Sequence, residues 1–134
     1  MQPSEFKIRI DDIANKLEKN GVELVKKVAL AVDQAVVLST PVDTGRARSN
    51  WLVSVDNPEE RTVETYGESS ASKAISQGSS EINSFGESNK AIYITNNLPY
   101  IQRLNDGYSA QAPAGFVEKS LQAGIEAARA GRLL

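Results

Sequence analysis

The hydrophobic pattern of the chain changes its period near residue 11. Phe6, Ile8 and Ile10 alternate with charged residues, which is typical of a short strand or of the start of a helix. From Asp11 onward, apolar residues recur three, four or seven positions apart, and this spacing predicts a helix over residues 11–39. Pro41 disfavours helical geometry at the residue before it, so we expect the helix to end near Ser39.

The predicted helix is unusually long for a chain of this size. Residues 11–39 would span about 43 Å as one straight helix, whereas a compact domain of 134 residues is about 36 Å across. Gly21 is the position where such a helix would kink. Two interpretations stay open: the helix bends inside one core, or part of its apolar stripe contacts another subunit.

The middle of the chain contains two candidate strands and a serine-rich insertion. Residues 40–48 contain proline, aspartate and glycine in an order typical of a loop. Alternation from Trp51 to Val55 predicts a strand, and residues 62–66 are expected to pair back with it as a hairpin. Residues 67–89 are rich in serine with few apolar positions, which indicates either a weak amphipathic helix or a flexible excursion.

The last third of the chain gives the clearest pattern. Residues 90–96 (KAIYITN) alternate as a strand, and Pro99 suits the first turn of a short helix that Gly107 closes. A final amphipathic helix is expected over residues 114–130. The order of these elements predicts an α+β fold: residues 1–134 form a single domain, in which a small antiparallel sheet of three or four strands packs against the long N-terminal helix and the C-terminal helix.

The composition of the chain excludes several kinds of catalytic and metal site. The chain has no cysteine and no histidine, so disulfides, thiolate metal sites and Ser-His-Asp or Cys-His catalysis are excluded. The net charge is −2, and no stretch has the dense lysine and arginine of a nucleic-acid footprint. No apolar run approaches the roughly 20 residues of a membrane span. We therefore expect no enzyme activity, no cofactor, no metal and no membrane partner.

One triplet resembles a catalytic motif. Asp43-Thr44-Gly45 matches the Asp-Thr-Gly of aspartic proteases, in which two carboxylates share a proton at a dimer interface. The context differs, because a predicted helix and Pro41 precede the triplet, and Arg46 and Arg48 follow it and would keep the carboxylates ionised. A dimeric aspartic protease is therefore kept as an alternative only.

The segment from residue 96 to residue 117, NNLPYIQRLNDGYSAQAPAGFV, is long, nearly neutral and rich in aromatic and turn residues. It is either a connection packed on the sheet or a structured contact loop. In the second interpretation Tyr100, Arg103 and Tyr108 are the anchors, because aromatic residues and arginine dominate interface energetics.

Two segments together resemble a known family. TPVDTGRARSNW (residues 40–51) follows a long helix, and the segment 96–117 precedes the C-terminal helix. In this order they are similar to the tail-completion proteins of long-tailed bacteriophages and prophages, also called head-tail joining, neck or minor tail proteins. The resemblance implies that the loop entering the sheet is fixed by Asp43, Thr44, Gly45 and Arg46, and that the later segment is shaped by Tyr100, Gly107, Pro113 and Gly115. The candidate structural or interface residues are these eight together with Trp51, Arg103 and Tyr108.

The resemblance also implies a function and partners. We expect a structural subunit that forms a homo-oligomeric ring at the head-tail interface of a virion and is assembled in the host cytoplasm. Its neighbours would be connector, neck, tail-tube or terminator proteins, with DNA present only as the passing genome. The acidic stretch of residues 49–90, which holds seven acidic and three basic residues, would then face the DNA channel without trapping the genome. A prophage-derived protein-interaction adaptor is a further alternative.

Overall fold

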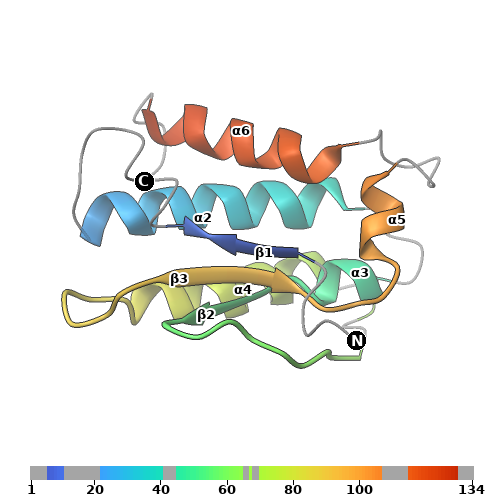
Figure 1. The fold of residues 1–134 in the computed structure, drawn as a ribbon, viewed down its shortest axis with the longest axis horizontal. Helices are drawn as coiled ribbons and strands as arrows, with labels where there is room; N and C mark the ends of the chain where they lie inside the picture. The colour runs from blue at the N-terminus through green and yellow to red at the C-terminus, as the bar shows by residue number, and fades with distance from the viewer. Residues whose placement is uncertain are drawn as a thin grey trace.

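A computed structural model of the chain describes residues 6–10, 22–40, 45–64, 67, 70–106 and 115–129 (Figure 1). Its elements, in chain order, are β1 (Phe6–Arg9), α2 (Val22–Ser39), α3 (Arg46–Ser49), β2 (Leu52–Val55), α4 (Ser70–Asn83), β3 (Ile92–Asn96), α5 (Ile101–Asn105) and α6 (Phe116–Arg129). Helices and a small sheet occur together, so the predicted α+β class is confirmed.

The three strands form one antiparallel sheet in the order β1-β3-β2. Ile94 of β3 lies opposite Ile8 of β1 on one side and opposite Val53 of β2 on the other. Residues opposite each other share a face, so these three buried side chains form a row that meets the helices. The predicted strands at residues 51–55 and 90–96 are confirmed, with β2 beginning at Leu52 and β3 at Ile92. Of the two interpretations of the N-terminal segment, the structure shows the strand, β1.

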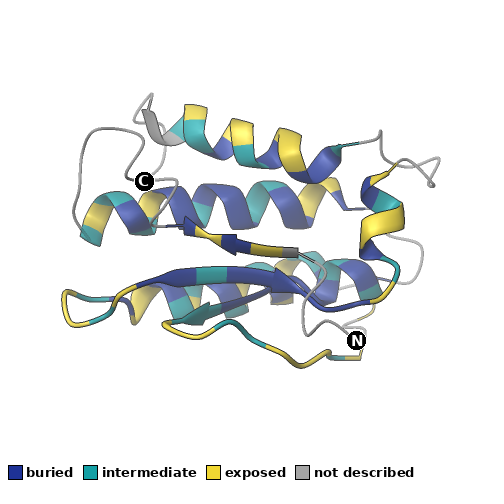
Figure 2. Ribbon diagram, in the orientation of Figure 1, coloured by how far each residue is buried: buried dark blue, intermediate teal, exposed yellow. Residues whose placement is uncertain are grey.

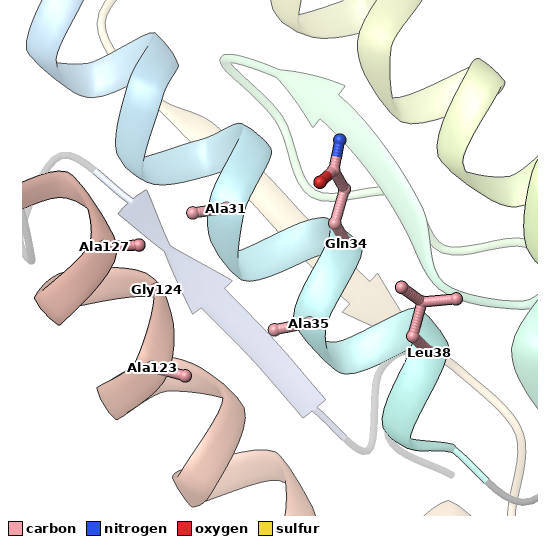
Figure 3. Close-up of a pocket in the computed structure, with 7 residues that line it drawn as sticks. All are labelled: Ala31, Gln34, Ala35, Leu38, Ala123, Gly124 and Ala127. Carbon is pink, nitrogen blue, oxygen red and sulfur yellow. The ribbon is translucent and has the colours of Figure 1, made fainter. Parts of the chain in front are cut away.

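Helix α2 is the centre of the helical layer. It packs between α4 and α6 and also contacts β3, and the three helices lie side by side over the sheet (Figures 1 and 3). Val28, Val32 and Val36 are fully buried, as their spacing predicts. The predicted end of the helix at Ser39 is confirmed. The Thr40 hydroxyl donates to the Val36 carbonyl at 2.6 Å and so satisfies one of the last carbonyls.

The N-terminal part of the predicted long helix, including Gly21, lies outside the described residues. Helix α2 itself begins at Val22.

Residues of the serine-rich insertion form helix α4, which docks through small side chains. Ser70, Ala74, Gly78 and Ile82 are buried at a spacing of four. The Gln77 side-chain amide accepts from the Val53 N–H at 3.1 Å and donates to the Val53 carbonyl at 2.9 Å. This amide therefore covers the outer edge of β2 in the way that another strand would.

The predicted hairpin strand at residues 62–66 is wrong in its described part, because Thr62–Glu64 form no strand. Val63 pairs with a side chain instead: its N–H donates to the Asn50 side-chain oxygen at 2.7 Å, and its carbonyl accepts from the Asn50 amide at 2.9 Å. The segment crosses the outer face of the sheet, where the Thr95 hydroxyl donates to the Glu59 carbonyl. Hydrogen bonds from side chains thus replace the backbone hydrogen bonds expected between two paired strands.

The predicted loop at residues 40–48 is only partly a loop. Residues 46–48 belong to the short helix α3. The turn-forming residues before this helix led to the prediction of a loop. Residues 41–44 lie outside the described part of the chain.

Burial follows the two-layer arrangement (Figure 2). The largest fully buried side chains come from both layers and from α5 and α6, and include Trp51, Phe116, Ile92, Ile94, Leu98 and Ile101. The exposed residues gather on the outer faces of α4 and α6 and along the segment after β2. Over the residues the structure describes, no helix combines the length and hydropathy needed to cross a bilayer.

Candidate functional site

The two sequence segments with family resemblance meet at one end of the domain. This end, named here the α3–α5 end, comprises Thr40, Gly45–Trp51, Asn96–Asp106 and Gly115–Val117. In Figure 1 it is the side where α5, α3, the end of α2 and the start of α6 come together. Segments about 50 positions apart in the chain thus build one continuous piece of the structure.

Trp51 anchors the first segment beneath the end of α2. Its side chain is fully buried, and its indole N–H donates to the Thr40 hydroxyl oxygen at 2.8 Å. The same hydroxyl donates onward to the Val36 carbonyl. The chain of two hydrogen bonds satisfies the polar atom of a buried tryptophan and holds the residue after α2 in place.

Arg48 caps the C-terminus of α2 from α3. Its Nε donates to the Thr40 carbonyl at 3.0 Å, and its Nη2 donates to the Leu38 carbonyl at 2.9 Å. Helix α2 has no basic residue in its own last turn, so Arg48 supplies the positive charge that a helix C-terminus favours. Partial burial lowers the pKa of the Arg48 guanidinium below its ordinary value.

Gly45 makes the turn into α3. Its φ is +78°, in the left-handed region that favours glycine. Its carbonyl accepts from both the backbone N–H of Ser49, at 3.0 Å, and the Ser49 hydroxyl, at 2.7 Å. This geometry agrees with a structural role for Gly45, while Asp43 and Thr44 lie outside the described residues.

Asn96 joins the second segment to the first. It is fully buried at the end of β3, and its side-chain amide donates to the Ala47 carbonyl of α3 at 3.1 Å. Its side-chain oxygen accepts from the Leu98 N–H at 3.2 Å. The neighbouring Asn97 amide donates to the carbonyls of Glu59 and Arg61 at 2.9 and 2.8 Å. Two consecutive asparagines therefore bind two different segments to the end of β3.

Asn105 joins α5 to the start of α6. Its side-chain oxygen accepts from the Val117 N–H at 2.8 Å, and its side-chain amide donates to the Glu118 carboxylate at 2.9 Å. Its backbone carbonyl accepts from the Gly115 N–H at 2.6 Å. Gly115 has a φ of +79°, in the left-handed region that favours glycine.

Replacing Asn105 with alanine is expected to lower the free energy of unfolding by about 1–2 kcal/mol, because the buried Val117 N–H loses its acceptor. Chemical denaturation measures the loss. The exposed Asn83 is the matched control, and its alanine variant should change the free energy by less than about 0.5 kcal/mol. Equal effects at the two positions would mean that the Asn105 contacts do not hold α6.

The predicted contact residues have different exposures. Trp51 is fully buried and Tyr100 is half-buried against the core, whereas Arg103 is exposed on α5 beside Gln102. Gly107, Tyr108 and Pro113 lie outside the described residues. Arg46 is half-buried on α3. The surface available to a partner on α5 therefore consists of polar side chains next to the half-buried Tyr100.

An apolar groove runs between α2 and α6 beside this end (Figure 3). A cavity of about 280 Å³ is lined by Ala31, Gln34, Ala35, Leu38, Ala123, Gly124 and Ala127. The alanine side chains of the two helices point toward each other across it, while Gln34 and Leu38 point away from α6. Leu38 is 55% exposed, which is unusual for a leucine beside a groove. Methyl groups dominate the walls, so the groove has few polar groups with which to orient a small molecule.

Chemistry-bearing residues do not gather within the described part of the chain. No group of three or more acidic, histidine or cysteine residues there could hold a metal ion. Asp33 is a fully buried carboxyl group on α2, away from the groove residues. It has no place in the sequence predictions, although its position four residues after the buried Ala29 was a signal that it shares the apolar stripe.

The sequence predictions also missed Asn50, Asn96, Asn97 and Asn105, which make the polar contacts of the α3–α5 end. The pair of asparagines directly after a clear strand was the available signal, because side-chain amides can both donate and accept. Comparisons of the chain with protein-family models, with curated proteins and with solved structures find no match.

Proposed function

We propose that this chain is a structural subunit of the neck or tail of a long-tailed bacteriophage and forms a homo-oligomeric ring at the head-tail interface. The observation that carries the proposal is the meeting of the two family-like segments, through the hydrogen bond from the Asn96 amide to the Ala47 carbonyl. Segments that resemble one family in sequence are also one unit in space. A shared structural role explains why both segments are present.

A closed ring needs two different surfaces on each subunit, one for each neighbour. Two surfaces of this domain suit that requirement. One is the exposed side of α5 with Gln102 and Arg103. The other is the α2–α6 groove with the exposed Leu38. A polar surface with a half-buried aromatic neighbour and an apolar groove are different in chemistry, as heterologous contacts require.

Light scattering coupled to size-exclusion chromatography tests the proposal. We expect the purified chain to form closed oligomers of uniform mass, visible as rings by negative-stain electron microscopy. An antiserum against the chain should also label the head-tail junction of virions of the phage that encodes it. A chain that stays monomeric at every concentration and is absent from virions would contradict the proposal and favour the adaptor alternative.

Charge reversal on α5 gives a sharper test. Arg103→Glu is expected to raise the protein concentration needed for ring formation at least tenfold, since truncation of an interface arginine often changes affinity by this much or more. Lys90→Glu is the matched control, because Lys90 is exposed in the connection from α4 to β3, at the opposite end of the domain (Figure 1). Both variants should remain folded at the concentrations of the assembly measurement, which circular dichroism checks. If the two variants assembled equally well, α5 would not be part of the interface.

Asp43→Asn separates the structural proposal from the protease alternative. A structural subunit should assemble normally with this change, and the purified wild-type chain should release no peptide fragments from unfolded protein substrates. Peptide cleavage that disappears in the Asp43→Asn variant would instead identify an aspartic protease, since its chemistry needs that carboxyl group.

A further inference from the structure

Asp33 is a carboxyl group buried without a partner. It lies on α2 with no exposed surface, and within the described residues neither of its side-chain oxygens has a hydrogen-bond donor. Buried polar groups are almost always hydrogen-bonded, because an unpaired one loses its hydration without compensation. The position of Asp33 therefore calls for a physical explanation.

The carboxyl group faces helix α4. A Cβ atom added at Gly78 would overlap the Asp33 carboxyl group and would come within 3.0 Å of the Val53 side chain. Gly78 thus leaves the space that the Asp33 carboxyl group occupies. Gly78 of α4 therefore lies directly against this carboxyl group, and the apolar Val53 side chain of β2 lies beside the same point.

The protonation state of Asp33 determines the energetic cost of burying its carboxyl group against Gly78. Burial raises the pKa of Asp33 well above its ordinary value of 3.8, because the charged form loses far more hydration than the neutral acid. A neutral carboxyl group fits against Gly78 at modest cost. An ionised one favours any rearrangement that lets water reach it.

Helix α4 is the element whose removal would let water in. Its buried positions are Ser70, Ala74, Gly78 and Ile82, so only one large apolar side chain of the helix is buried, while Ala71 and Ile75 are half-buried against the core. Its polar contacts include the two hydrogen bonds between Gln77 and Val53 and a 3.3 Å bond from the Lys26 ammonium to the Asn83 carbonyl. Less apolar area therefore holds α4 than would hold a helix docked by several buried leucines and valines.

We propose that α4 is a releasable helix whose docking onto α2 and β2 requires a neutral carboxyl group at Asp33. Loss of the proton opens α4 and hydrates the carboxylate. Helix α6 lies on the other side of α2 and stays packed. This device is independent of the proposed ring function.

Among the residues that the structure describes, no charged group compensates Asp33. The positions of α4 that are buried against the domain are not titratable, and β2 has no titratable residue. The charged side chains on the elements around it are Glu23, Lys26 and Lys27 of α2, Lys73 and Glu81 of α4, and Arg46 and Arg48 of α3. None of these forms an ion pair or a hydrogen bond with the Asp33 carboxyl group, and burial alone accounts for its raised pKa.

The sign of the pH effect follows from proton binding. The pKa of Asp33 is higher with α4 docked than with α4 released, so the docked form binds more protons between pH 3.8 and the raised pKa. Docking is therefore strongest at low pH and weakens as pH rises through this window, by up to about tenfold per pH unit. Above the raised pKa, Asp33 is ionised in both forms and no longer makes the equilibrium change with pH.

Hydrogen exchange measured by NMR on the full chain between pH 5 and pH 8 tests the device. After correction for intrinsic exchange, α4 amides of the wild type should open more often as pH rises, by up to about tenfold per pH unit. The opening of the α6 amides should not change with pH. In Asp33→Asn, which stays neutral at every pH, the α4 amides should show no such trend. Asp33→Ala gives the same expectation if the asparagine variant folds poorly.

Glu81→Gln is the matched control, because it removes a carboxylate of α4 that makes no hydrogen bond with Asp33. The wild-type trend should remain in this variant. A trend that persists in both Asp33 variants would overturn the proposal. Loss of protection in α4 and α6 together would overturn it as well, since the whole domain would then be opening.

Discussion

Replacing Trp51 with alanine is expected to lower the free energy of unfolding by about 3–5 kcal/mol, the usual cost of removing a large buried aromatic side chain. Trp51 is the largest fully buried residue, and its indole N–H is the donor that the Thr40 hydroxyl accepts. A typical domain is stable by only about 5–15 kcal/mol. The variant should therefore be folded only marginally at room temperature.

The measurement is urea denaturation followed by far-ultraviolet circular dichroism, because Trp51 is the single tryptophan and its fluorescence disappears with the substitution. Trp51→Phe keeps the apolar ring and removes the indole N–H, so it should cost less than the alanine variant. Tyr93→Ala removes a half-buried aromatic ring from the outer face of the sheet and is the matched control. A loss at Trp51 no larger than the loss at Tyr93 would show that the indole does not hold the α3–α5 end together.

The regular elements with large apolar side chains could be predicted from the sequence. The valines of α2 and the isoleucines of β3 repeat at periods that identify a helix and a strand directly. The end of α2 at Ser39 was also predictable, because Pro41 restricts the residue before it. In each of these cases the information lies within one continuous stretch of the chain.

The packing of α4 could not be predicted in the same way. Helical spacing places Ala71, Ile75, Gly78, Ile82 and Phe85 on one face. The structure buries the last three of these, but Ala71 and Ile75 are only half-buried, and Ser70 and Ala74 are buried instead. Small residues are buried here because they let the helix approach α2 and β2 closely. Hydrophobicity carries no signal for such a contact, since its cause is the shape of the neighbouring elements.

The candidate site was predictable as two segments but not as one structure. The turn at Gly45 follows from local chemistry, as does the short helix after Pro99. The contacts that join the segments depend on Asn96, Asn97 and Asn105, whose partners are distant in the chain or belong to another element. The sequence around an asparagine does not indicate which distant group it bonds, so only the structure could identify these contacts.

Replacing Gly124 with valine is expected to cost about 3 kcal/mol or more, as overpacking a contact between rigid elements does at the upper end of its range. Gly124 is buried in α6 against α2. A Cβ atom at this position would lie 3.0 Å from the Val32 backbone nitrogen and 3.1 Å from the Val32 Cα. Backbone atoms in the middle of a helix cannot move aside alone, so α6 as a whole would have to shift away from α2.

Gly124→Ala sets two effects against each other, which makes it the informative variant. Alanine favours a helix over glycine by about 1 kcal/mol, but its methyl group meets the α2 backbone, so we expect a net loss of stability. Gly86→Ala is the control, because no atom lies within 4 Å of its added Cβ, and it should stabilise the fold by about 0.4–1 kcal/mol. Urea denaturation of both variants measures the difference. A stabilising alanine at position 124 would mean that α2 and α6 are not in backbone contact there, because propensity alone would then govern the result.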